Sequence, residues 1–108
     1  MATVQIVDNL TVSVIDAPQV IYTAPAGQDM LIQSFTAANT SAVNASYKAY
    51  ISSASGVQQP QIPFRVVVWG ENDLGIGIVN QVIPRGGTLK VECSALESVY
   101  FTVSGRVS

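Results

Sequence analysis

The sequence contains no histidine, a single cysteine and few charged side chains. The absence of histidine removes the usual general base, the Ser–His and Cys–His nucleophile pairs, and the commonest zinc ligand. Cys93 has no second cysteine with which to form an intrachain disulfide, which favours synthesis in a reducing cytosol. These absences predict a protein that is not an enzyme and that uses no cofactor and no metal.

Charge is the scarcest property of this chain. Charged residues make up 11% of its 108 residues, against roughly 25% in an average domain. Five basic and seven acidic side chains cannot cover the surface of one small domain. Since the mean hydropathy is +0.36, part of the remaining surface is expected to be apolar and buried against other protein. The alternative is a monomer whose surface is polar but uncharged.

Composition also argues against nucleic acids and membranes as partners. The net charge is −2 and the basic residues are scattered, whereas phosphate binding needs them clustered. No apolar run approaches the 18 or so residues of a spanning helix. The first five residues, Met1 to Gln5, lack the basic and apolar regions of a signal peptide. Without secretion, the sequons at Asn9, Asn39 and Asn44 are expected to be polar residues of turns and strands.

Apolar and polar residues alternate along much of the chain, as in half-buried β-strands. Leu89, Val91 and Cys93, for example, alternate with Lys90 and Glu92. Turn signals such as Pro-Ala-Gly and Pro-Arg-Gly-Gly separate these runs. The pattern predicts about eight short strands, over 2–7, 10–15, 19–23, 30–38, 46–52, 63–69, 76–83 and 88–94 with 98–107 as a closing pair.

Short strands at this spacing predict an all-β fold, an antiparallel β-sandwich or jelly-roll-like domain. We assign that domain to residues 19–108 and leave residues 1–18 open as an N-terminal arm or a first hairpin. The run 64–69 is apolar apart from Arg65, which indicates a central strand or one whose outer face a partner covers. Residues 52–63 are predicted to form the longest loop.

Few residues suggest chemistry. Glu71 and Asp73 lie close to Trp69, and two carboxylates beside an aromatic ring could serve glycoside hydrolysis. With Asn72 they could also bind calcium, but the EF-hand spacing is absent and the segment is ordinary turn sequence. Cys93 lies on the apolar side of its alternating run and is interpreted as structural.

Two segments carry a resemblance to a known group of proteins. The first runs from Ile21-Tyr22-Thr23-Ala24-Pro25-Ala26-Gly27 into Leu31 to Ser41, and the second runs from Ile83-Pro84-Arg85-Gly86-Gly87 to Ser98 to Gly105. These turns and strands resemble small β-sandwich virion proteins of tailed bacteriophages. The likeness covers residues 20–105 in outline, although 53–80 depart from the usual Leu-rich version.

The resemblance implies a capsid decoration, or cement, protein on the capsid surface of the virion. Such a protein would form a homo-oligomer, commonly a trimer, and would bind the major capsid protein or another virion protein. The alternatives are a tail, neck or fibre or baseplate adaptor protein, and a carbohydrate-binding module that uses aromatic rings as a platform. The candidate interface residues are Val4, Ile6, Tyr22, Tyr50 and Trp69.

Overall fold

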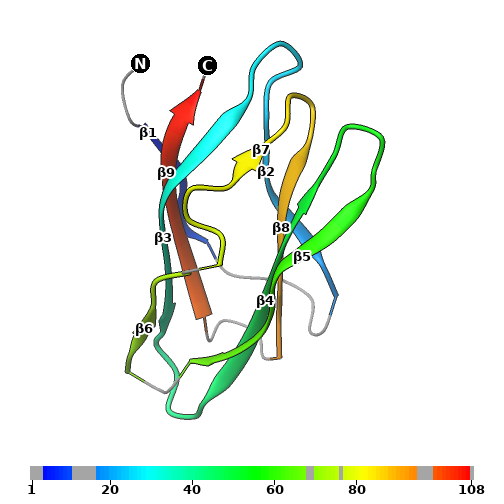
Figure 1. The fold of residues 1–108 in the computed structure, drawn as a ribbon. Helices are drawn as coiled ribbons and strands as arrows, with labels where there is room; N and C mark the ends of the chain where they lie inside the picture. Colours follow the sequence, from blue (N-terminus) through cyan, green and yellow to red (C-terminus); the bar gives the residue numbers. More distant parts are fainter. Residues whose placement is uncertain (1–3, 11–16, 68–69, 76, 95–98, 108) are drawn as a thin grey trace.

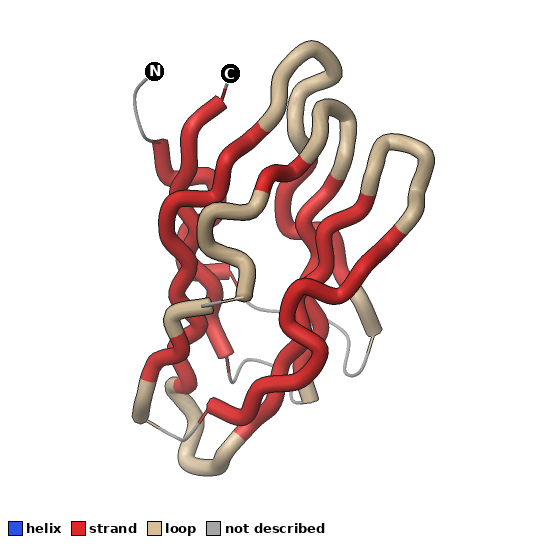
Figure 2. Tube along the Cα trace, in the orientation of Figure 1, coloured by secondary structure: helices blue, strands red, loops and turns tan. Residues whose placement is uncertain are grey.

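A computed structural model describes residues 4–10, 17–67, 70–75, 77–94 and 99–107 of the chain. The fold is all-β, with two antiparallel sheets packed face to face (Figure 1), so the predicted β-sandwich is confirmed. Figure 2 shows the described residues as strand and loop, with no helix among them. Within those residues, no helix of the length and hydropathy needed to cross a membrane is found.

Each sheet is built around one long antiparallel pair. Sheet A has the order β1 (Val4–Leu10), β9 (Val99–Val107), β3 (Met30–Asn39) and β6 (Asn72–Asp73), and β7 (Val82–Ile83) also pairs with β3. Sheet B has the order β2 (Gln19–Thr23), β8 (Thr88–Cys93), β4 (Ala45–Ser52) and β5 (Gln58–Val67). Consecutive strands thus lie in different sheets at several points, as in sandwiches generally.

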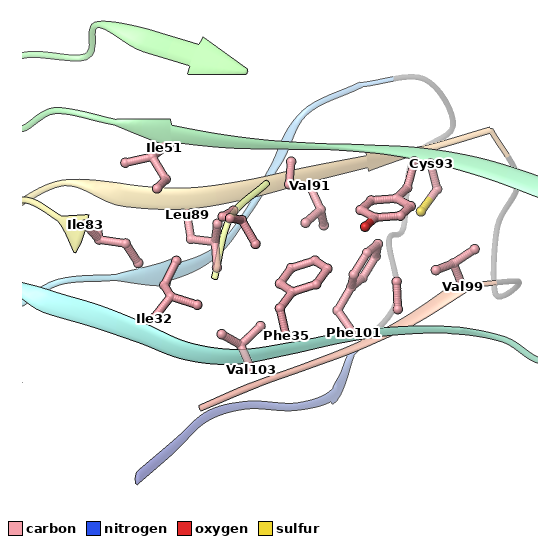
Figure 3. Close-up of a cluster of buried hydrophobic side chains, with 14 of the residues drawn as sticks. Ile32, Phe35, Ile51, Ile83, Leu89, Val91, Cys93, Val99, Phe101 and Val103 are labelled. Atoms are coloured by element: carbon pink, nitrogen blue, oxygen red, sulfur yellow. The ribbon is translucent and has the colours of Figure 1, made fainter. Parts of the chain in front are cut away.

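The alternation read from the sequence places one face of each strand in a shared core. Leu89, Val91 and Cys93 of β8 are at most 1% exposed, and they point towards the side chains of β3 and β9 (Figure 3). At the centre lies an aromatic cluster of Phe35, Tyr47 and Phe101, whose ring centroids are 5.5 to 5.9 Å apart. Such aromatic pairs stabilise the core beyond the contribution of the apolar area that they bury.

The predicted loop over 52–63 is wrong over most of its length. β5 begins at Gln58 and forms a hairpin with β4, closed by hydrogen bonds from Ser53 N to Val57 O (3.0 Å) and from Gly56 N to Ser53 O (2.9 Å). Pro60 lies within the strand, where it lacks an N–H donor. Because β5 is an edge strand, that missing donor costs little. Of the two interpretations of 64–69, the central strand is wrong for its described residues 64–67, and a strand whose outer face a partner covers stays a prediction.

The predicted strand over 76–83 is reduced to the two residues of β7. The amides of Ile78 and Val79 both donate to Gly75 O, at 2.9 and 3.1 Å, and form a turn instead. Gly75 (φ +61°) and Asn80 (φ +70°) are in the left-handed region, which a strand cannot accommodate. Ile78 is nevertheless fully buried, so its apolar character reflects the core and not a strand.

The N-terminal segment has a defined place in sheet A. β1 runs antiparallel to β9, with Gln5 opposite Ser104 and Val7 opposite Val103. The strand expected over 10–15 falls largely on residues 11–16, which are outside the described residues. β1 therefore pairs with the last strand of its own chain, at the edge of the sheet.

Candidate functional site

The outward side of sheet B carries three charged side chains, Lys48, Lys90 and Glu92. We define the outer face of sheet B as the side chains of Val20, Ser46, Lys48, Tyr50, Val66, Lys90 and Glu92. Cross-strand partners share a face of a sheet, and the register sets Val20 opposite Lys90, Lys90 opposite Tyr50, Lys48 opposite Glu92, and Ser46 opposite Val66. The face is therefore a mixed patch with cations, a carboxylate, a tyrosine and two valines.

A hydrogen bond at its centre joins two neighbouring strands. The hydroxyl of Tyr50 donates to Oε1 of Glu92 at 2.6 Å, and Tyr50 is only 8% exposed although it points outward. Burial, followed by the hydrogen bond to Glu92 and its negative charge, raises the pKa of Tyr50 to about 12. The Tyr50 side chain is thus held against the sheet by its bond to Glu92 and does not project from the outer face of sheet B.

Apolar side chains border the same face on both sides. Val20 on β2 is 47% exposed and Val66 on β5 is 62% exposed, and these two strands are the edges of sheet B. Four further large apolar side chains are exposed elsewhere on the described surface: Val43, Val57, Leu74 and Val82. Edge valines on a chain with so few charges are candidates for burial against another protein.

The four sequence-predicted interface residues that the structure describes lie on three different strands. Val4 and Ile6 lie on β1, at the edge of sheet A. Tyr22 on β2 is half-buried and packs against the core, and burial raises its pKa. Trp69 lies outside the described residues. Tyr50 belongs to the outer face of sheet B, so the role of all five in an interface stays a prediction.

The two carboxylates considered for catalysis have different surroundings. Glu71 is exposed, whereas Asp73 accepts hydrogen bonds from the buried hydroxyl of Tyr47 and from Gly75 N, the latter at 3.3 Å. Asp73 is therefore engaged in holding its own turn. Among the described residues, no group of three or more His, Cys, Asp or Glu side chains could hold a metal ion.

Cys93 is buried, as the sequence predicted. The side chain is 1% exposed and lies in the core of the sandwich. Burial, with a smaller effect of the neighbouring Glu92 carboxylate, raises the pKa of the thiol to about 12. A thiol in this state is a poor nucleophile because almost none of it is ionised at neutral pH.

A surface hollow of about 480 Å³ lies beside β3, and no motif in the sequence predicted it. Its lining is uncharged and comprises Gln33, Ser34, Phe35, Thr36, Leu74, Val79 and Asn80. It arises where the 77–80 turn replaces the predicted strand. Phe35, its one aromatic lining residue, is 2% exposed and offers no ring on which a sugar could stack.

Comparison with known proteins adds no relative. No family model, no curated protein and no solved structure matches this chain.

Proposed function

We propose that this chain is a non-enzymatic structural subunit of a tailed-bacteriophage virion, and that it acts as a decoration or cement protein on the head shell. Its resemblance in turns and strands to small β-sandwich virion proteins supports this proposal. So does the all-β sandwich fold. A cement protein needs repeated contacts of moderate strength, which become strong in combination.

The observation that carries the proposal is the border of exposed valines on the outer face of sheet B. Val20 and Val66 are two of the six exposed large apolar side chains described, and they flank Lys48, Lys90 and Glu92. Protein interfaces combine apolar contacts with polar, hydrated ones in this way. We assign this face to the contact with the major capsid protein, or with another virion protein.

The test is binding of the purified chain to phage heads stripped of their decoration. Co-sedimentation should show saturable binding in hundreds of copies for a head protein, whereas about six or twelve copies would indicate a tail or neck component, since copy number follows the symmetry of the site. A chain that binds no virion part would contradict the proposal.

The contact face can be tested with a matched pair of substitutions. Val66→Glu places a charge on the outer face of sheet B, while Val43→Glu makes the same change at an equally exposed valine, 61% against 62%, in the loop between β3 and β4. We expect Val66→Glu to weaken head binding at least tenfold, about 1.4 kcal/mol, and Val43→Glu to leave it unchanged. Equal effects of both substitutions would exclude this face.

A further inference from the structure

The junction between β1 and β9 is the least regular strand pairing of sheet A. β1 matches β9 at Val4–Gly105, Gln5–Ser104, Val7–Val103 and Leu10–Phe101, with register shifts on both sides of Val7. On its other side, β9 pairs with β3 from Met30 to Asn39 with a single shift. Each shift interrupts the ladder of backbone hydrogen bonds, so β1 is held less firmly than β3.

The edge position of β1 makes it separable. β1 is the outermost strand of sheet A and is bonded on one side to β9. It can leave β9 without breaking the pairing of any other described strand, and elements with irregular pairing and few contacts are among those that open first. Its departure would expose the edge of β9, whose inward residues Phe101 and Val103 are fully buried, and that edge must then be covered again.

We propose that β1 is exchanged between copies, so that residues 4–10 of one copy pair with β9 of the next. The segment that would cover the β9 edge is known from the structure. Another copy of the chain carries an identical β1, which can pair with β9 in the same register. Exchange keeps each β1–β9 hydrogen bond and adds only the contacts between copies, which is why such exchange is a low-cost route to oligomers. This inference rests on the assembly part of the proposed function.

Exchange in one direction around a ring produces a closed oligomer. Each copy gives β1 to one neighbour and receives β1 from the other, a head-to-tail contact that closes when the rotation between copies allows it. Two copies can also close by reciprocal exchange, and the trimer that the resemblance implies is the smallest ring in which each copy has two different neighbours. Self-assembly would then use sheet A, which leaves the outer face of sheet B free for the shell.

A disulfide between β1 and β9 shows whether β1 pairs with β9 of another copy or with β9 of its own chain. Gln5→Cys with Ser104→Cys joins direct cross-strand partners, whose spacing suits a disulfide. The substitutions are made in a Cys93→Ala background, and also with Cys93 retained because that thiol is buried. The matched control is Thr36→Cys with Thr102→Cys, partners on β3 and β9 that exchange of β1 does not separate.

Proteins oxidised at assembly concentration are compared on a denaturing gel without reductant, and their solution mass is measured by light scattering. We expect the 5/104 pair to give covalent oligomers, including circular trimers, and the 36/102 control to give only single chains. If light scattering shows oligomers but the gel shows only single chains, the chain assembles without exchanging β1, and the proposed exchange is wrong. A monomer in solution, or a 5/104 pair that fails to oxidise while the control oxidises, would also overturn the exchange; head binding tests the proposed function separately.

Discussion

The hydroxyl of Tyr47 in sheet B donates a hydrogen bond to Oδ2 of Asp73 in sheet A. Tyr47 is fully buried, and its ring packs between Phe35 and Phe101, so the bond crosses the core of the sandwich. The same carboxylate oxygen accepts from Gly75 N at 3.3 Å. One carboxylate thus anchors the two-residue strand β6 and the start of the following turn to the opposite sheet.

Removing this hydroxyl should destabilise the fold without disturbing its packing. We expect Tyr47→Phe to lower the free energy of unfolding by about 2 kcal/mol, the usual range for a hydrogen bond to a charged group. Urea denaturation followed by circular dichroism measures the loss. Tyr100→Phe is the control, since Tyr100 is half-buried on the outward side of β9; a loss as large there would contradict a special role for the Tyr47 bond.

Asn39 fixes the loop that connects β3 of sheet A to β4 of sheet B. Its side-chain amide, in a residue 2% exposed, donates to Val43 O at 2.9 Å and to Val67 O at 2.8 Å. Its Oδ1 accepts from the amide and the hydroxyl of Ser41, at 3.0 and 2.8 Å. The last residue of β3 therefore fixes both the loop to β4 and the end of β5.

We expect Asn39→Ala to be among the most damaging single substitutions in the chain. It removes the buried bond to Val67 O and the part-buried bonds to Val43 O and to Ser41, and a loss of about 3 kcal/mol follows from the usual cost of such bonds together. Val43→Ala, in the same loop but exposed, should cost less than about 0.5 kcal/mol. Equal unfolding midpoints for the two variants in urea would refute the importance of the Asn39 network.

The Tyr50–Glu92 pair predicts a loss of stability in alkali. The pKa of Tyr50 is raised to about 12 in the folded chain, above the value of about 10 for an unfolded tyrosine. The folded state therefore favours the protonated hydroxyl, so its stabilising effect is complete below pH 10 and is lost as the pH rises from about 10 to 12. Absorbance of the tyrosinate ion should show Tyr50 titrating late, and Glu92→Gln should lower the pKa of Tyr50 by removing the negative charge beside it. An unchanged titration in Glu92→Gln, with Glu71→Gln as control, would contradict this pairing.

The sequence predicts this fold well where alternation and burial coincide. β8 and β9 were predicted within one residue at each end because their inward residues are apolar and their outward residues polar. It fails at β5, where the predicted loop over 52–63 overlaps an edge strand that tolerates proline. It fails again at 76–83, where the buried Ile78 belongs to a turn.

The candidate site was harder to predict than the fold. The contact between Tyr50 and Glu92 depends on β4 lying beside β8, and forty-two residues separate the two in sequence. Alternation says which residues point outward but not which strands are neighbours. The exposed borders formed by Val20 and Val66 likewise depend on β2 and β5 being the edges of sheet B.

Cys93 provides a chemical measure of how tightly the core is closed. The thiol is 1% exposed and its pKa is raised to about 12, chiefly by burial. We therefore expect no reaction with Ellman's reagent in the native protein near pH 8, and one rapid equivalent after unfolding in urea, where the thiol has its ordinary pKa of about 8.5. Rapid labelling of the native chain would show that the sandwich opens at the ends of β8 and β9. In Tyr47→Phe, the labelling rate should rise in proportion to the lost stability, because reaction then proceeds through transient opening of the core.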